Sequence, residues 1–335
     1  MRAVVLVGGF GTRLRPLTAW TPKQMLPVVH RPMIEWVVAH LAEYCVDDVV
    51  LSLGYRPDAF RAAYPGDSCA GATLHYAVEP EPLDTAGAIG FAATSAGIDE
   101  RFLVVNGDVL TDLDIGALVE FHAAAGAEAT IALHRVGDPS MFGVVSTDDD
   151  GRVLAFVEKP PPGQAPTDLI NAGTYVLEPS VLERIVAGRR VSIERETFPS
   201  VVAARSLYAR HDGGVYWIDA GTPAQYLQVQ LDLIDGRRGP SPEAVHRDAL
   251  VATGARVARS VLEAGVTVAT GAEVRNSVVL AGATIEAGAL LADSIVAAGA
   301  VVGRHAVVEG CSVVGEAVTV PDGQHLTGAR VPEPA

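Results

Sequence analysis

The chain has 335 residues, of which 49% are hydrophobic, and its formal net charge is −15, from 40 acidic and 25 basic residues. This length suits about two domains, and the apolar content argues against wholesale disorder. The acidic surplus argues against a broad basic surface for nucleic acid.

The first residues and the cysteines argue against secretion and membrane insertion. The start MRAVVLVGG has one basic residue and an apolar run too short for a signal peptide. No stretch approaches the roughly 20 apolar residues of a membrane helix. Cys45, Cys69 and Cys311 have neither an even count nor CxxC spacing, which disfavours a disulfide framework and a structural zinc site. We therefore expect a cytoplasmic protein with no membrane or nucleic-acid partner.

Short apolar runs alternate with helical patterns as far as residue 235. The runs that predict strands lie at 3–7, 48–53, 73–78, 102–108 and 129–136. Residues 32–45 and 114–126 carry apolar residues at helical spacing, with Pro32 expected in a first turn and Gly126 at a helix end. The alternation predicts an α/β domain with a mainly parallel sheet over residues 1–235.

A glycine-rich stretch, LVGGFGTRLRPLT at 6–18, directly follows the first predicted strand. Glycines let main-chain N–H groups wrap around phosphate. Gly11 is followed by Thr-Arg, so the P-loop pattern fails, and Leu14 replaces the third glycine of a dinucleotide fingerprint. The remaining interpretation is a nucleotide loop in which Arg13 and Lys23 neutralise the phosphates.

The residue pattern changes from alternating strands and helices to a repeat after a linker at 236–252. Four segments, beginning at Arg259, Asn276, Asp293 and Cys311, align with one another. The second residue of each is serine, and these serines fall 17, 17 and 18 residues apart. Aliphatic residues recur at about every sixth position, as in the triangular coils of a parallel β-helix. We predict a left-handed hexapeptide β-helix over 253–328, in preference to a valine-rich β-sandwich.

The stretch LVGGFGTRLRPLTAWTPKQMLPV at 6–28 resembles the signature of sugar-nucleotide pyrophosphorylases. These nucleotidyltransferases join a nucleoside triphosphate to a sugar 1-phosphate. Seven further stretches resemble the family in order: EPLDTAGAI, VNGDVL, FGVV, FVEKP, INAGTYV, VSIERETFP and YWIDAGTPAQY. The resemblance implies a Rossmann-like three-layer nucleotidyltransferase domain followed by the β-helix that many members carry.

The resemblance also implies the nucleotide-binding and metal-binding residues. Arg13 and Lys23 are expected to be catalytic, and Asp108 and Asp219 to hold Mg²⁺, which prefers oxygen ligands. The nucleotide is expected to contact Leu6, Gly8, Gly9, Gly11, Thr12, Arg13, Glu79, Asp84 and Gly107. Asp84 stands where the family usually has glycine, in a loop that lies against the base.

The sugar phosphate is expected to contact Gly143, Glu158, Lys159, Asn171, Gly173 and Arg195. Glu158 can accept hydrogen bonds from sugar hydroxyls, and Lys159 can hold the phosphate. The competing interpretations are a solvated strand end for these two, ordinary turn chemistry for the glycines, and surface pairing of Arg195 with a neighbouring glutamate.

Among family branches, the sequence looks most like the mannose-1-phosphate guanylyltransferases, which implies GTP and mannose 1-phosphate as substrates. Alternatives are a different sugar-like 1-phosphate, thymidylyl or uridylyl transfer to glucose 1-phosphate, and a non-catalytic regulatory subunit that binds sugar nucleotides. An acyltransferase β-helix is a further alternative, for which His305 alone is a candidate base. We expect the tail to form a homo-oligomer instead.

Overall fold

The computed structural model describes residues 1–54 and 56–333. The chain divides into two compact units. The first unit contains Met1–Gly9 and Ile34–Trp217, and the second contains Phe10–Met33 and Ile218–Ala335. The second unit therefore holds residues 10–28 of the glycine-rich signature together with the tail. The predicted domain boundary near residue 235 stays a prediction.

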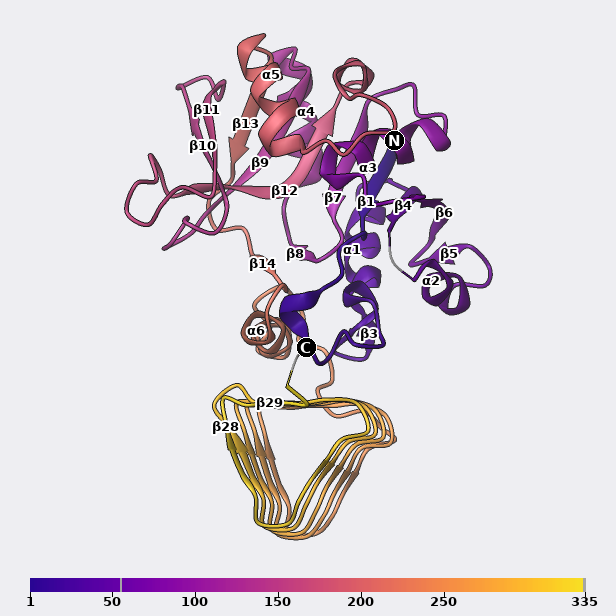
Figure 1. Ribbon diagram of the computed structural model, residues 1–335, viewed down its shortest axis with the longest axis vertical. Helices are drawn as coiled ribbons and strands as arrows, with labels where there is room; N and C mark the ends of the chain where they lie inside the picture. The colour runs from indigo at the N-terminus through magenta and orange to yellow at the C-terminus, as the bar shows by residue number, and fades with distance from the viewer. Residues whose placement is uncertain (55, 334–335) are drawn as a thin grey trace. The chain divides into compact units, whose positions relative to one another are not determined.

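A mixed sheet forms the centre of the first unit (Figure 1). Its strand order is β11-β10-β12-β7-β1-β4-β6-β5, with β9 pairing β12 and β13. The central strands β7, β1, β4 and β6 are parallel, and β12 is antiparallel to β7. Their bounds are β1 (Arg2–Leu6), β4 (Asp48–Leu53), β5 (Ser68–Cys69), β6 (Ala72–Val78), β7 (Phe102–Asn106), β9 (Ala129–Arg135), β10 (Gly143–Thr147), β11 (Val153–Glu158), β12 (Leu169–Leu177) and β13 (Leu207–His211). The five predicted strands are confirmed as β1, β4, β6, β7 and β9.

Helices cover both faces of this sheet. On one face, α3 and α5 share a buried core with Ile131 of β9. The next residue along β9, Thr130, points to the other face, where its hydroxyl is 2.8 Å from Nδ1 of His122 in α4. This arrangement confirms the predicted three-layer α/β class. The prediction of a mainly parallel sheet is wrong, because β12 pairs antiparallel with β7, β9 and β10, and both outer pairs, β10–β11 and β5–β6, are antiparallel. The helices are α1 (Met33–Ala42), α2 (Pro57–Ala63), α3 (Asp84–Ser95), α4 (Ile115–Ala125) and α5 (Phe198–Ala203), and β8 spans Val109–Thr111.

The two predicted helices are confirmed as α1 and α4, but both are shorter than predicted: Met33–Ala42 against 32–45, and Ile115–Ala125 against 114–126. Gly126 ends α4 in the left-handed conformation, with φ of 58°, as expected of a terminator. The placement of Pro32 in a first helical turn is wrong. Pro32 pairs with Pro27 between β2 (Pro27–Val28) and β3 (Arg31–Pro32), and the helix begins at the next residue.

The tail winds into coils of triangular outline (Figure 1). Three parallel sheets form its sides, in the orders β15-β18-β21-β24-β27, β16-β19-β22-β25-β28 and β17-β20-β23-β26-β29. These sheets are consistent with the predicted left-handed β-helix. The strands are β15 (Leu250–Val251), β16 (Arg256–Ala258), β17 (Val261–Leu262), β18 (Thr267–Val268), β19 (Glu273–Arg275), β20 (Val278–Val279), β21 (Thr284–Ile285), β22 (Leu290–Ala292), β23 (Ile295–Val296), β24 (Val301–Val302), β25 (Val307–Glu309), β26 (Val313–Val314), β27 (Thr319–Val320), β28 (His325–Thr327) and β29 (Arg330–Val331).

Aliphatic side chains stack through the centre of the coils. Val268, Ile285, Val302 and Val320 are aligned partners on successive coils, and all four are buried. Each coil on its own would expose this apolar surface, and stacking removes it from water at roughly 25 cal/mol per Å². Inward positions on one side of the triangle therefore recur once per coil, and the six-residue aliphatic period of the sequence comes from inward positions on successive sides.

The repeated serines form a hydrogen-bonded column inside one corner. The hydroxyl of Ser260 accepts from the backbone N–H of Ser277 at 3.1 Å, and Ser277 does the same for Ser294 at 3.1 Å. Each hydroxyl also donates to a carbonyl two residues earlier, at 2.8 and 2.7 Å for these two. The serines are buried, so each one satisfies an N–H that would otherwise have no water.

Replacing Ser277 with alanine is expected to lower the free energy of unfolding by about 1–3 kcal/mol. The substitution leaves the buried N–H of Ser294 without its acceptor. Urea denaturation of the tail measures this loss. Thr270→Ala, on an exposed side chain of the same coil region, is the control. Equal stability of the two variants would show that the serine column does not stabilise the coils.

Candidate active site

The first part of the site lies in the second unit, where a short turn, η1 (Thr12–Leu14), follows Gly11. Gly11 has φ of 61°, and a Cβ there would lie 3.0 Å from Cγ2 of Thr18 and 3.3 Å from Cβ of Lys23. The Thr18 hydroxyl donates to the Gly11 carbonyl at 2.8 Å and closes the loop. A glycine is therefore required at this position, and the turn brings Lys23 against the loop.

Three predicted site residues meet in this unit. Nζ of Lys23 lies 3.3 Å from Oδ1 of Asp219, and Nη2 of Arg13 lies 3.9 Å from Oδ2. The side chain of Lys23 is 6% exposed and that of Asp219 is 19% exposed, whereas Arg13 is 60% exposed. The fold thus holds two cations around one carboxylate, although Lys23 and Asp219 are 196 residues apart.

Gly221 explains how closely these groups approach. A Cβ at this position would lie 2.7 Å from Nη2 of Arg13 and 2.9 Å from Oδ1 of Asp219. Any larger residue would displace one of the two charged groups. Gly221 follows the end of β14 (Trp217–Asp219) and precedes α6 (Pro223–Ile234). It was not among the predicted site residues, although it stands inside one of the motifs.

The next group of predicted residues lies in the first unit, where β1 and β7 end. The N–H of Gly107 donates to the carbonyl of Leu6 at 2.9 Å, so the two strand ends are in contact. A Cβ at Gly8 would lie 3.4 Å from Oε1 of Glu79. Glu79 in turn accepts from the Leu83 N–H at 3.0 Å. Leu6, Gly8, Glu79 and Gly107 are therefore brought together at the carboxyl ends of parallel strands, a common ligand position in α/β folds.

Asp84 is the first residue of α3 and is exposed. It has φ of 61°, a conformation that glycine adopts freely and aspartate tolerates. Its Oδ1 accepts from the N–H of Thr85 at 2.8 Å. The backbone at this position thus suits the glycine that the family usually has, and the aspartate keeps the same turn.

Gly143 and Glu158 face each other on β10 and β11. A Cβ at Gly143 would lie 2.6 Å from Cζ of Phe156 and 3.0 Å from Oε2 of Glu158, so only glycine fits. Lys159 follows with φ of 48°, and its Nζ is 3.6 Å from Oε1 of Glu158. These three predicted residues are therefore neighbours.

Asn171 and Gly173 lie on β12, and much of the Asn171 side chain is used within the strand. Its Oδ1 accepts from the Gly173 N–H at 2.9 Å, and its Nδ2 donates to Oη of Tyr175 at 2.8 Å. Gly173 has φ of 75°, and a Cβ there would lie 2.5 Å from Nδ2 of Asn106. Asn106, the last residue of β7, was not predicted, because only the fold shows that it reaches Gly173.

Arg195 lies in a π-helical turn, η4 (Ile193–Thr197), and π-turns are frequent at functional sites. Its neighbour Glu194 accepts hydrogen bonds from the hydroxyls of Thr85 at 2.8 Å and Ser192 at 2.7 Å. Burial raises the pKa of Glu158, and the negative charge of Glu194 adds to this rise, while Lys159 and Arg195 oppose it. The sequence interpretation considered Glu194 only as a partner for Arg195, so its link to Thr85 was missed.

The predicted metal ligands lie in different units. Asp108 stands between β7 and β8, and Asp219 is the last residue of β14. Within the described part of the chain, no three His, Cys, Asp or Glu side chains group closely enough to hold a metal ion by themselves. Carboxylate oxygens are nevertheless the donors that Mg²⁺ prefers, and Mg²⁺ usually keeps several waters or phosphate oxygens. Both carboxylates suit Mg²⁺, and its binding by Asp108 and Asp219 stays a prediction.

The nucleotidyl transferase family model matches residues 2–236, which is more than half of the chain. This chain belongs to the nucleotidyl transferase family. A GMPPB C-terminal domain model matches residues 241–334. A mannose-1-phosphate guanylyltransferase of Mycobacterium tuberculosis is 43% identical over 269 residues, covering 79% of this chain and 74% of that protein. A probable mannose-1-phosphate guanylyltransferase 2 of Arabidopsis thaliana is 39% identical, covering 78% and 71%.

Solved structures resemble the chain as well. HddC from Yersinia pseudotuberculosis is 28% identical with a TM-score of 0.59, covering 68% of this chain and 97% of that chain. HddC complexed with GMP-PN is 28% identical with a TM-score of 0.58 and the same coverage. The resemblance to sugar-nucleotide pyrophosphorylases is therefore confirmed at the level of the family.

Both lysines of this family member lie at predicted site positions. The chain has only two lysines among its 25 basic residues, Lys23 and Lys159. The other 23 basic residues are arginines.

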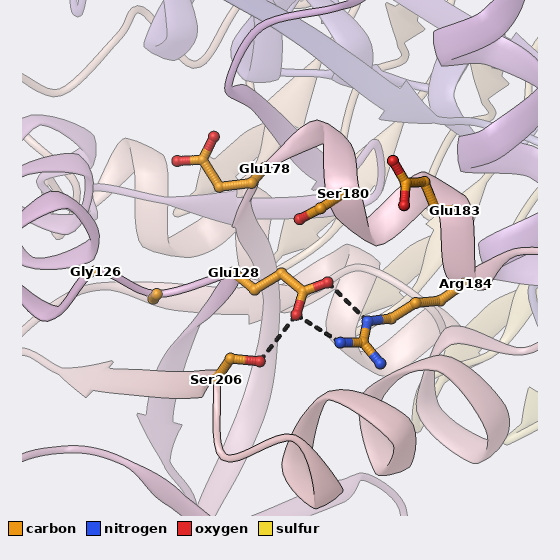
Figure 2. A pocket seen from close by; sticks show the side chains of 8 residues that line it. Gly126, Glu128, Glu178, Ser180, Glu183, Arg184 and Ser206 are labelled. Atoms are coloured by element: carbon orange, nitrogen blue, oxygen red, sulfur yellow. Dashed lines mark hydrogen bonds and ion pairs between the residues drawn. The ribbon is translucent and has the colours of Figure 1, made fainter.

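A separate pocket of about 610 Å³ lies on the first unit (Figure 2). Within it, Arg184 and Glu128 form a bidentate ion pair, with hydrogen bonds of 2.7 and 2.8 Å. The Ser206 hydroxyl donates a further hydrogen bond to Glu128 at 2.9 Å. The bond from Arg184 lowers the pKa of Glu128. The described residues that line the pocket include none of the predicted site residues, and their one cation, Arg184, is already paired with Glu128.

The segment that follows Lys23 is held by α6 and by the first coil of the tail. Gln230 accepts from the Val29 N–H and donates to the Pro27 carbonyl, both at 2.8 Å. The His30 ring faces two acceptors, Oε2 of Glu263 at 3.0 Å and the Glu243 carbonyl at 2.9 Å. Only a protonated imidazole donates from both nitrogens, and the bond to Glu263 raises the pKa of His30 above its usual value.

Replacing His30 with asparagine is expected to destabilise the protein by about 1.5 kcal/mol at pH 6. Because the folded state raises the pKa of His30 above 6.5, its stabilisation is complete below pH 6.5 and is lost as pH rises through the folded-state pKa. Urea denaturation between pH 6 and 9 should show the difference shrinking with pH. His325→Asn, on an exposed ring, is the control. A difference that grows with pH would contradict the assignment.

Among residues 1–54 and 56–333, no helix combines the length and the apolar character that crossing a membrane requires.

Proposed function

We propose that the protein transfers a guanylyl group from GTP to mannose 1-phosphate, giving GDP-mannose and pyrophosphate. The observation that carries the proposal is the grouping of Arg13, Lys23 and Asp219 beside the glycine loop in a member of the nucleotidyl transferase family. The choice of GTP and mannose 1-phosphate follows the names of the relatives at 43% and 39% identity. The HddC complex with GMP-PN supports a guanine nucleotide in this fold.

The reaction needs no nucleophile from the protein. An anionic oxygen of the sugar phosphate attacks the α-phosphorus of the nucleotide in line, and the bond from that phosphorus to the bridging oxygen breaks as pyrophosphate leaves. Main-chain N–H groups of the loop around Gly11 and Thr12 bind phosphate oxygens. Arg13 and Lys23 neutralise the charge that develops on the leaving group.

Asp108 and Asp219 are the residues proposed to hold Mg²⁺. When bound, the ion supplies charge neutralisation at the phosphate oxygens. The two cations beside Asp219 would turn toward the negatively charged nucleotide when it binds. Leu6, Gly8, Gly9, Glu79, Asp84 and Gly107 are proposed to line the rest of the nucleotide site.

The sugar phosphate is proposed to lie against Gly143, Glu158, Lys159, Asn171, Gly173 and Arg195. The glycines leave room for the sugar ring beside the backbone, and Lys159 supplies a charge for the phosphate. The raised pKa of Glu158 makes its carboxylate a stronger hydrogen-bond acceptor for sugar hydroxyls than an ordinary glutamate. The hydrogen bond from Asn171 to Tyr175 fixes the orientation of the Asn171 side chain on β12.

The experiment is pyrophosphate release with Mg²⁺, crossing GTP, ATP, UTP, CTP and dTTP against mannose 1-phosphate and glucose 1-phosphate. Release confined to GTP with mannose 1-phosphate supports the proposal. GTP turnover without a preference between the sugars would indicate a different sugar-like phosphate. Preference for another nucleotide would mean that Asp84 redirects the base pocket. No release with any pair would favour a regulatory subunit that binds without turnover.

We also propose that the enzyme is a homo-oligomer formed through the tail and that it works in the cytoplasm. Leu250 and Val251 of the edge strand β15 are 66% and 43% exposed, which leaves apolar surface for a second copy. Light scattering gives the mass in solution, and Leu250→Lys should lower it. A monomeric mass for the unaltered protein would contradict the oligomer.

A further inference from the structure

The last coil of the tail contacts the nucleotide loop. Nη1 of Arg330, on β29, donates to the main-chain carbonyls of Arg13 at 3.1 Å and Arg15 at 3.3 Å. These residues are more than 300 positions apart in the sequence and belong to the same compact unit. A Cβ at Gly315 on the preceding coil would lie 3.2 Å from Cβ of Pro16, so the coil and the loop approach closely.

The turn has no N–H of its own for the Arg13 carbonyl. The Leu14 N–H bonds the Gly11 carbonyl at 2.9 Å, and the Arg15 N–H bonds the Thr12 carbonyl at 3.2 Å. The next bond in this series would run from residue 16 to the Arg13 carbonyl, but residue 16 is proline and has no N–H. A positive charge is also favourable where a helical turn exposes its carbonyl groups. Arg330 supplies both the donor and the charge.

The position of the Arg13 side chain depends on its backbone. That side chain is 60% exposed, and its ion pair with Asp219 is long, at 3.9 Å. Neither burial nor a close side-chain bond to Asp219 therefore fixes the guanidinium. A fixed main chain at residues 13 to 15 limits where the guanidinium can go, and pre-organisation of this kind is a recognised source of catalytic efficiency.

We propose that Arg330 is a positioning residue for the nucleotide loop, so that the β-helix tail contributes directly to nucleotide binding and turnover. Its effect on turnover rests on the proposed function, whereas its effect on the loop does not. The tail then has a role in positioning the nucleotide loop in addition to the proposed oligomerisation. This positioning role belongs to the last coil, which contains Arg330.

The test compares Arg330→Ala and Arg330→Lys with Arg256→Ala, which removes an exposed arginine from the first coils. In Arg330→Ala, kcat/KM for GTP should fall about tenfold, as expected for a charged hydrogen bond. KM for mannose 1-phosphate should stay within about twofold. A lysine can reach one carbonyl, so Arg330→Lys should recover part of the loss. Arg256→Ala should match the unaltered enzyme.

Hydrogen exchange provides a readout that needs no turnover. Amides of residues 11–18 should exchange about tenfold faster in Arg330→Ala, while amides of β18 and β21 keep their protection. Faster exchange in a protein without GTP activity would support the positioning role and refute only the proposed function. Unchanged exchange at residues 11–18, or loss of protection throughout the tail, would overturn the proposal.

Discussion

Replacing Lys23 with methionine is expected to lower turnover by roughly 10³-fold, within the range seen when one preorganised charge is removed from an active site. Methionine keeps the length of the side chain, which is 6% exposed, and removes the charge that lies 3.3 Å from Oδ1 of Asp219. Steady-state pyrophosphate release measures the effect on kcat. Calorimetric titration with GTP separates it from nucleotide binding.

The matched control for this variant is Arg247→Met, which removes a positive charge from a side chain of the same unit that is 86% exposed. Lys159→Met is a second comparison, because Lys159 is the other lysine of the chain and is proposed to bind the sugar phosphate. It should raise KM for mannose 1-phosphate more than KM for GTP. Turnover of Lys23→Met within threefold of the Arg247→Met control would remove Lys23 from the mechanism.

The tail could be predicted from the sequence because its order is local and repeated. Each coil places a serine and an inward aliphatic at nearly fixed spacing, and the structure pairs Ser260 with Ser277 and Val268 with Ile285 accordingly. The period is visible in one chain without knowledge of any long-range contact. The function of the last coil was not visible, because the bond from Arg330 to the Arg13 carbonyl depends on the end of the solenoid meeting a distant loop.

The site could be predicted in part. Residues that belong to local motifs could be predicted, whereas residues whose contacts lie on distant elements could not. Glycines of the site could be predicted because a motif places them beside strand ends. At Gly143, for example, a Cβ would clash with the ring of Phe156. Glu194 and Asn106 were missed because their roles come from contacts with Thr85 and Gly173 on other elements. The family resemblance assigned Lys23 and Asp219 to one site but did not predict that they pair, since nothing local links residues 196 positions apart.

Replacing Asp219 with asparagine should impair three properties that are measured separately. Turnover should fall by about 10²-fold or more, because the proposed magnesium ligand and the charge that pairs with Lys23 are lost together. The Mg²⁺ concentration for half-maximal activity should rise. The free energy of unfolding should fall by about 1–3 kcal/mol, because the nearly buried ammonium of Lys23 loses the carboxylate 3.3 Å away.

Asp235→Asn is the matched control, because Asp235 also forms a close ion pair, with Arg259 at 2.6 Å, but in a more exposed position at the end of α6. It should cost about 0–1 kcal/mol of stability and leave the Mg²⁺ dependence unchanged. If Asp219→Asn loses stability and activity but keeps the Mg²⁺ dependence of the unaltered enzyme, Asp219 serves only to hold Lys23 and Arg13. The metal would then have to bind through Asp108 and the nucleotide phosphates, and the same titration on Asp108→Asn would decide between these arrangements.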